Sequence, residues 1–383
     1  MRLRFFIFLI GIMFFTGGVL DAKLIDIYKK GVIRLSVDPS FGKGTDWVEL
    51  IYDSNHGIIM APDGSFFMSN SRQHNLSKFN LEGKYLFTFS QLGEGPGDLY
   101  YPSKPIILDN RCLIVNEYGE RMRFSIFDFS GKFVKIIRVK HSPSNLLPLR
   151  DNIVVYRHKQ PIPTPGPKIT KTDIYTVNVI TGNETLLMTL ETPRDYVSNG
   201  KGYSISFNNG YPYLERTKNG NLLVGLSHQP DIKIFSPDGK FIKSFKVNIR
   251  RLRNTDEIRK KRREKRLADI DNWKGLSPQQ KNKLKYGPLP PDPDYFPYYR
   301  DIMVDAEGNI LLHKWTECVG DECPLVFNVY SPEGVYVCDF RIEKYVNNFS
   351  FSNLLFTERG IFALVSYDDG EDTCYKLARI IPK

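Results

Sequence analysis

The six histidines are the residues best suited to acid–base or metal chemistry, because an imidazole titrates near neutral pH and readily binds metals. They are His56, His74, His141, His158, His228 and His313. No two stand at the close spacing of a metal-binding motif, and neither G-x-S-x-G nor H-E-x-x-H occurs. In an enzyme, His56, His228, His313 and Glu117 would be the candidate bases or ligands. The sequence therefore assigns no catalytic group and no cofactor, although a divalent cation stays an alternative.

A second set of residues could bind a ligand without reacting with it. Its members are polar or aromatic and stand near predicted strand ends: Asn70, Tyr101, Asn116, Tyr211, Tyr213, Arg216, Tyr299, Arg300, Lys314 and Trp315. Aromatic and arginine side chains on a concave surface are typical anchors for a protein or a saccharide. Packing between strands is the competing interpretation for each tyrosine.

The cysteines can indicate whether the protein is located in an oxidising or a reducing compartment. Cys318 and Cys323 enclose Val-Gly-Asp-Glu, a loop that could close as a local disulfide in an exported protein, and two reduced thiols are the alternative. Cys112 stands in an apolar segment and is expected in the core. The sequence does not decide whether Cys338 and Cys374 meet.

A dense acidic segment, Asp368–Asp372, offers carboxylates for a divalent cation. It lacks the alternating ligands of a calcium-binding loop, which favours a solvated turn.

These residues must be positioned by short strands, because the same hairpin turn recurs along the chain at intervals of about 50 residues. The five copies are Leu81–Lys84, Phe129–Lys132, Ile180–Asn183, Pro237–Lys240 and Pro332–Val335. A second class of tight turn alternates with the first, at 63–64, 110–111, 151–152, 219–220, 307–308 and 359–360. Two tight turns per unit imply four antiparallel strands per unit, which is a propeller blade.

The turn census predicts six blades, the last one strand short. Val32–Val37 is an unassigned strand near the N-terminus that could complete it and so remove an exposed sheet edge. With 26 Phe and 21 Tyr, the composition suits strands. We therefore expect an all-β fold over residues 23–383: a six-bladed β-propeller of four-stranded antiparallel blades, closed by an N-terminal strand, with a small helical insertion.

Residues 1–22 combine a basic start with an apolar run, Phe5–Phe15, that is short for a membrane span. This pattern predicts a signal peptide, or an uncleaved anchor. We expect an exported protein, periplasmic or extracellular.

The insertion covers residues 250–296. Residues 250–285 hold 14 Lys and Arg against five Asp and Glu, so most of the chain's net charge of +10 lies there. Asn254 with Glu257, and Ser277 with Gln280, predict the starts of two helices, followed by a proline-rich return. A helical flap with a solvated basic side is one interpretation. Attraction to an anionic polysaccharide, lipid head groups or an acidic protein is the other.

Both classes of tight turn must lie on one side of the disc, since they join strands one and two and strands three and four. The remaining connections are long: 69–76, 91–102, 116–122, 157–172, 192–211, 250–298 and 313–324. Elaborated loops on a rigid scaffold are where binding usually resides. We expect the ligand on this long-loop face.

One segment carries a family signature. Gly93–Leu99, with Gly95, Gly97 and Asp98, then Tyr101-Pro102 and Phe127–Lys132, resembles an NHL repeat. The whole mature chain resembles bacterial exported six-bladed propellers of the NHL or TolB-like kind. That resemblance implies relatives that bind proteins or nucleic acids and others that are lyases or lactonases, so it leaves function open.

Two functions remain. The first is a non-catalytic extracytoplasmic binding module, expected to be a monomer, that recognises a protein or polysaccharide on the long-loop face. The second is a metal-dependent propeller lyase or lactonase acting at the central channel. Nucleic-acid binding through the basic insertion is not expected of an exported protein.

Overall fold

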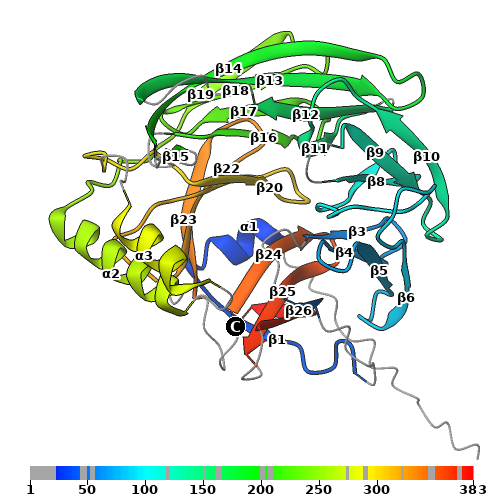
Figure 1. Ribbon diagram of the computed structural model, residues 1–383, viewed down its shortest axis with the longest axis horizontal. Helices are drawn as coiled ribbons and strands as arrows, with labels where there is room; N and C mark the ends of the chain where they lie inside the picture. The colour runs from blue at the N-terminus through cyan, green and yellow to red at the C-terminus, as the bar shows by residue number, and fades with distance from the viewer. Residues whose placement is uncertain are drawn as a thin grey trace, which may run out of the picture.

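A computed structural model describes the protein at residues 23–43, 50–51, 57–117, 121–150, 152–159, 166–198, 203–205, 210–272, 276–287, 292–320, 323–343, 350–368 and 373–382. The fold is a six-bladed β-propeller, with the sheets arranged in a ring (Figure 1). The predicted fold class is confirmed.

The first four blades follow one another along the chain. Blade one contains β3 (Gly57–Met60), β4 (Phe66–Asn70), β5 (Asn75–Phe79) and β6 (Tyr85–Phe89). Blade two contains β7 (Ile106–Leu108), β8 (Cys112–Asn116), β9 (Arg123–Phe127) and β10 (Phe133–Arg138). Blade three contains β11 (Ser144–Pro148), β12 (Ile153–Lys159), β13 (Gly166–Asn178), β14 (Glu184–Ser198) and a short β15 (Tyr203–Ile205). Blade four contains β16 (Pro212–Arg216), β17 (Leu222–Leu226), β18 (Asp231–Phe235) and β19 (Phe241–Lys246).

The last two blades are joined by the N-terminal strand. Blade five contains β20 (Asp301–Val304), β21 (Ile310–His313), β22 (Leu325–Tyr330) and β23 (Tyr336–Glu343). Blade six contains β24 (Ser350–Thr357), β25 (Gly360–Asp368) and β26 (Thr373–Pro382), with β2 (Leu50–Ile51) also paired to β26. The second half of β1 (Val32–Val37) is the predicted outer strand, antiparallel to β26, while its first half runs parallel to β23. One strand thus completes blade six and fastens it to blade five.

A short helix, α1 (Leu24–Tyr28), strengthens this closure and was not predicted. Tyr28 stacks on Phe340 of β23 with ring centroids 4.5 Å apart. Its hydroxyl donates to Asp305 Oδ2 at 3.1 Å. Because the ring is fully buried, α1 anchors the N-terminal segment to blade five.

The core lies between neighbouring blades. Ile114 and Phe124 of blade two, for example, pack with Val154 and Tyr156 of blade three. Both faces of each blade are covered, so apolar side chains are buried on both sides of the inner strands. The glycine turns fit the same packing: Gly131 has φ +82°, and a Cβ there would stand 2.9 Å from the Phe87 ring of blade one.

Blade three departs from the prediction. The segments predicted as long connections, 157–172 and 192–211, belong in part to β12, β13 and β14, which pair as a ribbon that extends beyond the other strands. Thr170 and Thr172 point inward and are buried, whereas Ile169 is exposed. Buried and exposed side chains do alternate along β13, but the buried ones are polar, so the sequence of this strand resembles that of a loop.

The insertion forms α2 (Asp256–Asn272) and α3 (Pro278–Tyr286), as the fold class anticipated. At α3 the Ser277–Gln280 capping box is present. At α2 the predicted cap is wrong: Asn254 donates to the Pro293 carbonyl at 3.0 Å, and Thr255 accepts from the Ile258 amide instead. None of the helices in the described ranges is both long and apolar enough to cross a membrane.

Candidate ligand-binding site under the helical insertion

A cavity of about 410 Å³ lies between α2 and the connection that joins β21 to β22. Five residues of α2 form one wall: Ile258, Arg262, Lys265, Arg266 and Asp269. They stand at positions i, i+4, i+7, i+8 and i+11 and therefore share one face of the helix. The opposite wall consists of Phe296, at the end of the insertion, and of Arg300 and residues 313–316, 318–320 and 323–325 on the side of blade five.

A stacked aromatic pair holds two arginines at this cavity. The rings of Phe296 and Trp315 lie 4.8 Å apart at an angle of 23°. The Arg300 guanidinium lies 5.0 Å from the Trp315 ring centre, and Arg262 lies 5.0 Å from that of Phe296. Arginine prefers to stack on aromatic faces in this way. The rings thus fix where both positive charges stand.

The charges in the cavity are unbalanced. Lys265 pairs with Asp269 at 3.0 Å, and Lys314 pairs with Asp339 at 3.2 Å. Burial lowers the pKa of Arg262, Asp292 opposes this, and the charge of Arg300 lowers the pKa further. Within the described part of the chain, no hydrogen bond or ion pair engages the Arg300 guanidinium. Two neighbouring guanidinium groups repel each other, and a bound anion would relieve that repulsion.

The blade-five wall is held rigidly. The backbone amide of Arg300 donates to the His313 carbonyl at 2.8 Å, and that of Lys314 to Val326 at 2.7 Å. The rim is closed by a disulfide between Cys318 and Cys323, whose Cα atoms are 5.6 Å apart. Such a wall fixes its polar groups before any ligand arrives.

Four residues singled out from the sequence meet at this cavity: His313, Arg300, Lys314 and Trp315. Two others lie close behind them. Tyr299 is fully buried in the interface between blades four and five, and the hydroxyl of Tyr213 donates to the Arg300 carbonyl. These two tyrosines pack and position, which was the competing interpretation.

The remaining candidates are dispersed. Asn70 is buried, with Oδ1 accepting from the Gln73 amide at 3.1 Å, and Asn116 is buried and donates to the Pro143 carbonyl at 3.1 Å. Tyr101 is exposed beside His74, whose Nδ1 accepts its amide hydrogen at 3.0 Å.

Tyr211 contacts blade three and not the cavity. The Arg157 guanidinium lies 5.1 Å from its ring centre. His228 is half-buried beside Gly210, and burial, followed by the charge of Arg251, lowers its pKa. These residues support the inner parts of blades three and four.

Two predictions need correction. Arg216 ends β16 beside the tight turn Thr217–Asn221, so it lies on the opposite face from the long loops. The sequence indicates that Arg216 stands near a strand end, but that end of β16 leads into a tight turn and not into a long loop. Glu117 is buried and accepts from Arg123 Nε at 2.6 Å and from the Tyr100 amide at 2.9 Å. Because its oxygens are engaged in this way, Glu117 is placed as a structural ion-pair partner.

His56 and the core of the acidic segment, residues 369–372, lie outside the described residues. Elsewhere in the described ranges, no three His, Cys, Asp or Glu side chains gather closely enough to hold a metal ion.

A charged cluster on the inner strands was missed from the sequence. Burial raises the pKa of Glu215 on β16 to about 7, with Lys104 opposing and Asp301 adding to the increase. Burial also raises the pKa of Asp301 on β20, opposed in part by Arg300, Lys104 and Arg157. The sequence does contain a signal for this cluster, because Glu215 is a charged residue within the first strand of its blade, where apolar residues are expected.

Comparisons with known proteins show the fold alone. No family model and no curated protein matches the sequence. The chain is similar to a solved structure from Bacteroides vulgatus, a member of the DUF4221 family, with 10% identity, a TM-score of 0.53, and 92% of this chain and 99% of that chain covered.

Two further solved structures are similar over most of the chain. One is a gluconolactonase from Xanthomonas campestris, with 11% identity, a TM-score of 0.43, and 90% and 99% of the two chains covered. The other is virginiamycin B lyase from Staphylococcus aureus, with 10% identity, a TM-score of 0.39, and 87% and 99% covered. The resemblance to NHL repeats remains a prediction, and the similarity to the DUF4221-family structure concerns the fold alone.

Proposed function

We propose that this protein is an extracytoplasmic binding module that holds an acidic glycan between α2 and blade five. The observation that carries the proposal is the cavity in which Arg262 and Arg300 converge on the Phe296–Trp315 pair. Planar guanidinium groups bind carboxylate or sulfate groups through paired hydrogen bonds. The aromatic pair keeps the two groups in place.

The shape of the site favours a glycan over a folded protein. A volume of about 410 Å³ is within the range of pockets that enclose small molecules or short oligomers. A stable protein partner would instead need an extended surface of about 1,000 Å² or more. The walls here would enclose a small ligand from two sides.

Export is part of the proposal. The Cys318–Cys323 disulfide belongs to an oxidising compartment, and the basic and apolar start of the chain is typical of a signal peptide. An acidic polysaccharide is a ligand that such a protein would meet outside the cytoplasm.

Calorimetric titration with oligogalacturonate, and with the same oligosaccharide after reduction of its carboxyl groups, tests the proposal. We expect binding of the acidic form only, weakening as salt rises. Arg300→Ala should weaken it by about tenfold or more, because a hydrogen bond to a charged group contributes about 1.5–3 kcal/mol.

Arg216→Ala is the matched control, since it removes an arginine from the opposite face. It should bind as the wild type does. Equal affinities for Arg300→Ala and Arg216→Ala, with both variants folded by circular dichroism, would exclude this cavity as the site.

A second candidate is a hydrolase or lyase acting at the inner strands, supported by the raised pKa values of Glu215 and Asp301 beside Lys104 and Arg157. A carboxyl that titrates near pH 7 is suited to general acid–base catalysis. Hydrolysis of a sugar lactone, lost in Glu215→Gln and retained in Arg300→Ala, would favour this function. Absence of turnover with and without added divalent cations would count against it.

A further inference from the structure

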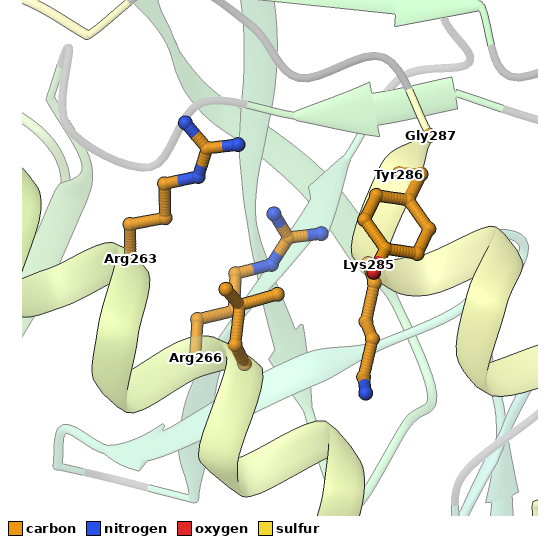
Figure 2. Close-up of a pocket in the computed structure, with 6 residues that line it drawn as sticks. Arg263, Arg266, Lys285, Tyr286 and Gly287 are labelled. Carbon is orange, nitrogen blue, oxygen red and sulfur yellow. The ribbon is translucent and has the colours of Figure 1, made fainter.

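A second basic pocket lies on the other side of α2. Its volume is about 340 Å³, and it is enclosed by α2 and the end of α3 (Figure 2). Arg263, Arg266 and Leu267 come from α2, and Lys285, Tyr286 and Gly287 come from α3 and its end. Neither the fold nor the cavity against blade five requires this pocket.

Its residues differ in how far they are engaged. Lys285 pairs with Asp271, and Arg266 donates to the Leu284 carbonyl, so both help to fasten α3 to α2. Arg263 is exposed and, within the described residues, takes part in no hydrogen bond or ion pair. Figure 2 shows the guanidinium groups of Arg263 and Arg266 extending to the same side of α2.

An aromatic ring accompanies these cations. Tyr286 is 78% exposed, far more than the packed tyrosines of the propeller. Its ring offers an apolar face, and its hydroxyl a hydrogen-bonding group, beside the arginines. That combination suits a sugar ring that bears a negative charge.

Arg266 connects the two pockets, because it lines both. Arg262 and Lys265 face blade five, whereas Arg263 faces α3. Positive charge therefore continues around α2 from one pocket to the other. Arg263 and Arg266 are three residues apart along α2, a rise of about 4.5 Å, which is comparable to the length of one sugar unit.

We propose that the pocket between α2 and α3 is a second anion subsite, and that the ligand is a linear polyanionic glycan long enough to occupy both pockets. This inference rests on the proposed function. It goes further in assigning a ligand whose repeated carboxylate or sulfate groups occupy two pockets and not one. Two linked subsites raise affinity through effective concentration, so affinity should depend on chain length.

The test is a length series of oligogalacturonates titrated by calorimetry into the full chain. For the wild type we expect affinity to rise at least tenfold once the oligomer is long enough to reach the second pocket. The double variant Arg263→Ala/Tyr286→Ala should lose that rise and still bind the short oligomers as the wild type does. Lys260→Ala removes an exposed charge of α2 that lines neither pocket, and it should keep the rise.

The outcomes separate the two proposals. If the double variant keeps the full length dependence, the second subsite is refuted, while a loss of binding in Arg300→Ala leaves the proposed function standing. If no oligomer binds, both proposals fail. If the double variant binds every oligomer as the wild type does but no longer sediments with vesicles of anionic phospholipid, the pocket is a lipid headgroup site and the inference is wrong.

Discussion

Replacing Glu215 by Gln should stabilise the protein at alkaline pH. Glu215 lies on the first strand of blade four, where burial raises the pKa of its carboxyl to about 7 from an ordinary value of 4.5. A raised pKa means that the folded state favours the protonated form. Glutamine has nearly the same shape and carries no charge, so it mimics that form at every pH.

The pKa shift gives the size and sign of the effect. Stability associated with the raised pKa is fully present below about pH 4.5 and is lost as pH rises through about 7. A difference of about 2.5 in pKa, at about 1.4 kcal/mol for each pKa unit, corresponds to about 3.5 kcal/mol at most. Glu215 is only partly shielded from solvent, and solvent screening reduces this value, so we expect about 2 kcal/mol at pH 8.

The measurement is the free energy of unfolding in urea at pH 8 and pH 5 for the wild type, Glu215→Gln and Glu333→Gln. The Glu215 variant should exceed the wild type at pH 8 and approach it at pH 5. Glu333 is the matched control, because hydrogen bonds from Ser331 lower its pKa, so its replacement should bring no gain at pH 8. A Glu215 variant that is no more stable than the wild type at pH 8 would refute the reasoning.

Two further predictions concern the wall of the cavity and the ion pair of blade two. The double variant Cys318→Ser/Cys323→Ser should lower the unfolding free energy by about 2 kcal/mol, since the disulfide closes a short loop. It should also weaken oligogalacturonate binding, and unchanged binding would show that the loop does not shape the site. Glu117→Ala should lower the unfolding free energy by about 3–5 kcal/mol, because Arg123 would remain buried without its partner; a loss below 1 kcal/mol in urea unfolding would contradict the structural role assigned to it.

The blades could be predicted from the sequence because their signals are local. Glycine at a tight turn and apolar alternation in the strands each depend on a few neighbouring residues, and Gly131 with φ +82° is an example. Closure by Val32–Val37 was predicted by counting strands, since an open sheet edge needs a partner. The ribbon of blade three was missed because its inward residues, Thr170 and Thr172, are polar.

The site was only partly predictable, for a physical reason. Arg300, Lys314 and Trp315 stand at the ends of strands in one blade, so topology alone brings them together. Arg262 reaches the same cavity only because α2 folds back onto blade five, and nothing local in the sequence specifies that contact. Glu215 likewise gains its raised pKa from burial among groups that are distant in sequence.

The way the insertion is attached explains how it can carry a binding wall without disturbing the propeller. Its two ends run side by side: the Asn254 amide donates to the Asp294 carbonyl at 2.8 Å, and Arg251 Nε donates to the Phe296 carbonyl at 2.8 Å. The two helices are therefore connected to the propeller through two adjacent segments, residues 251–254 and 294–296. Phe296, the last of them, is also the residue that stacks on Trp315. The base of the insertion and one wall of the cavity therefore share Phe296, which links the position of the basic helix to the site that it covers.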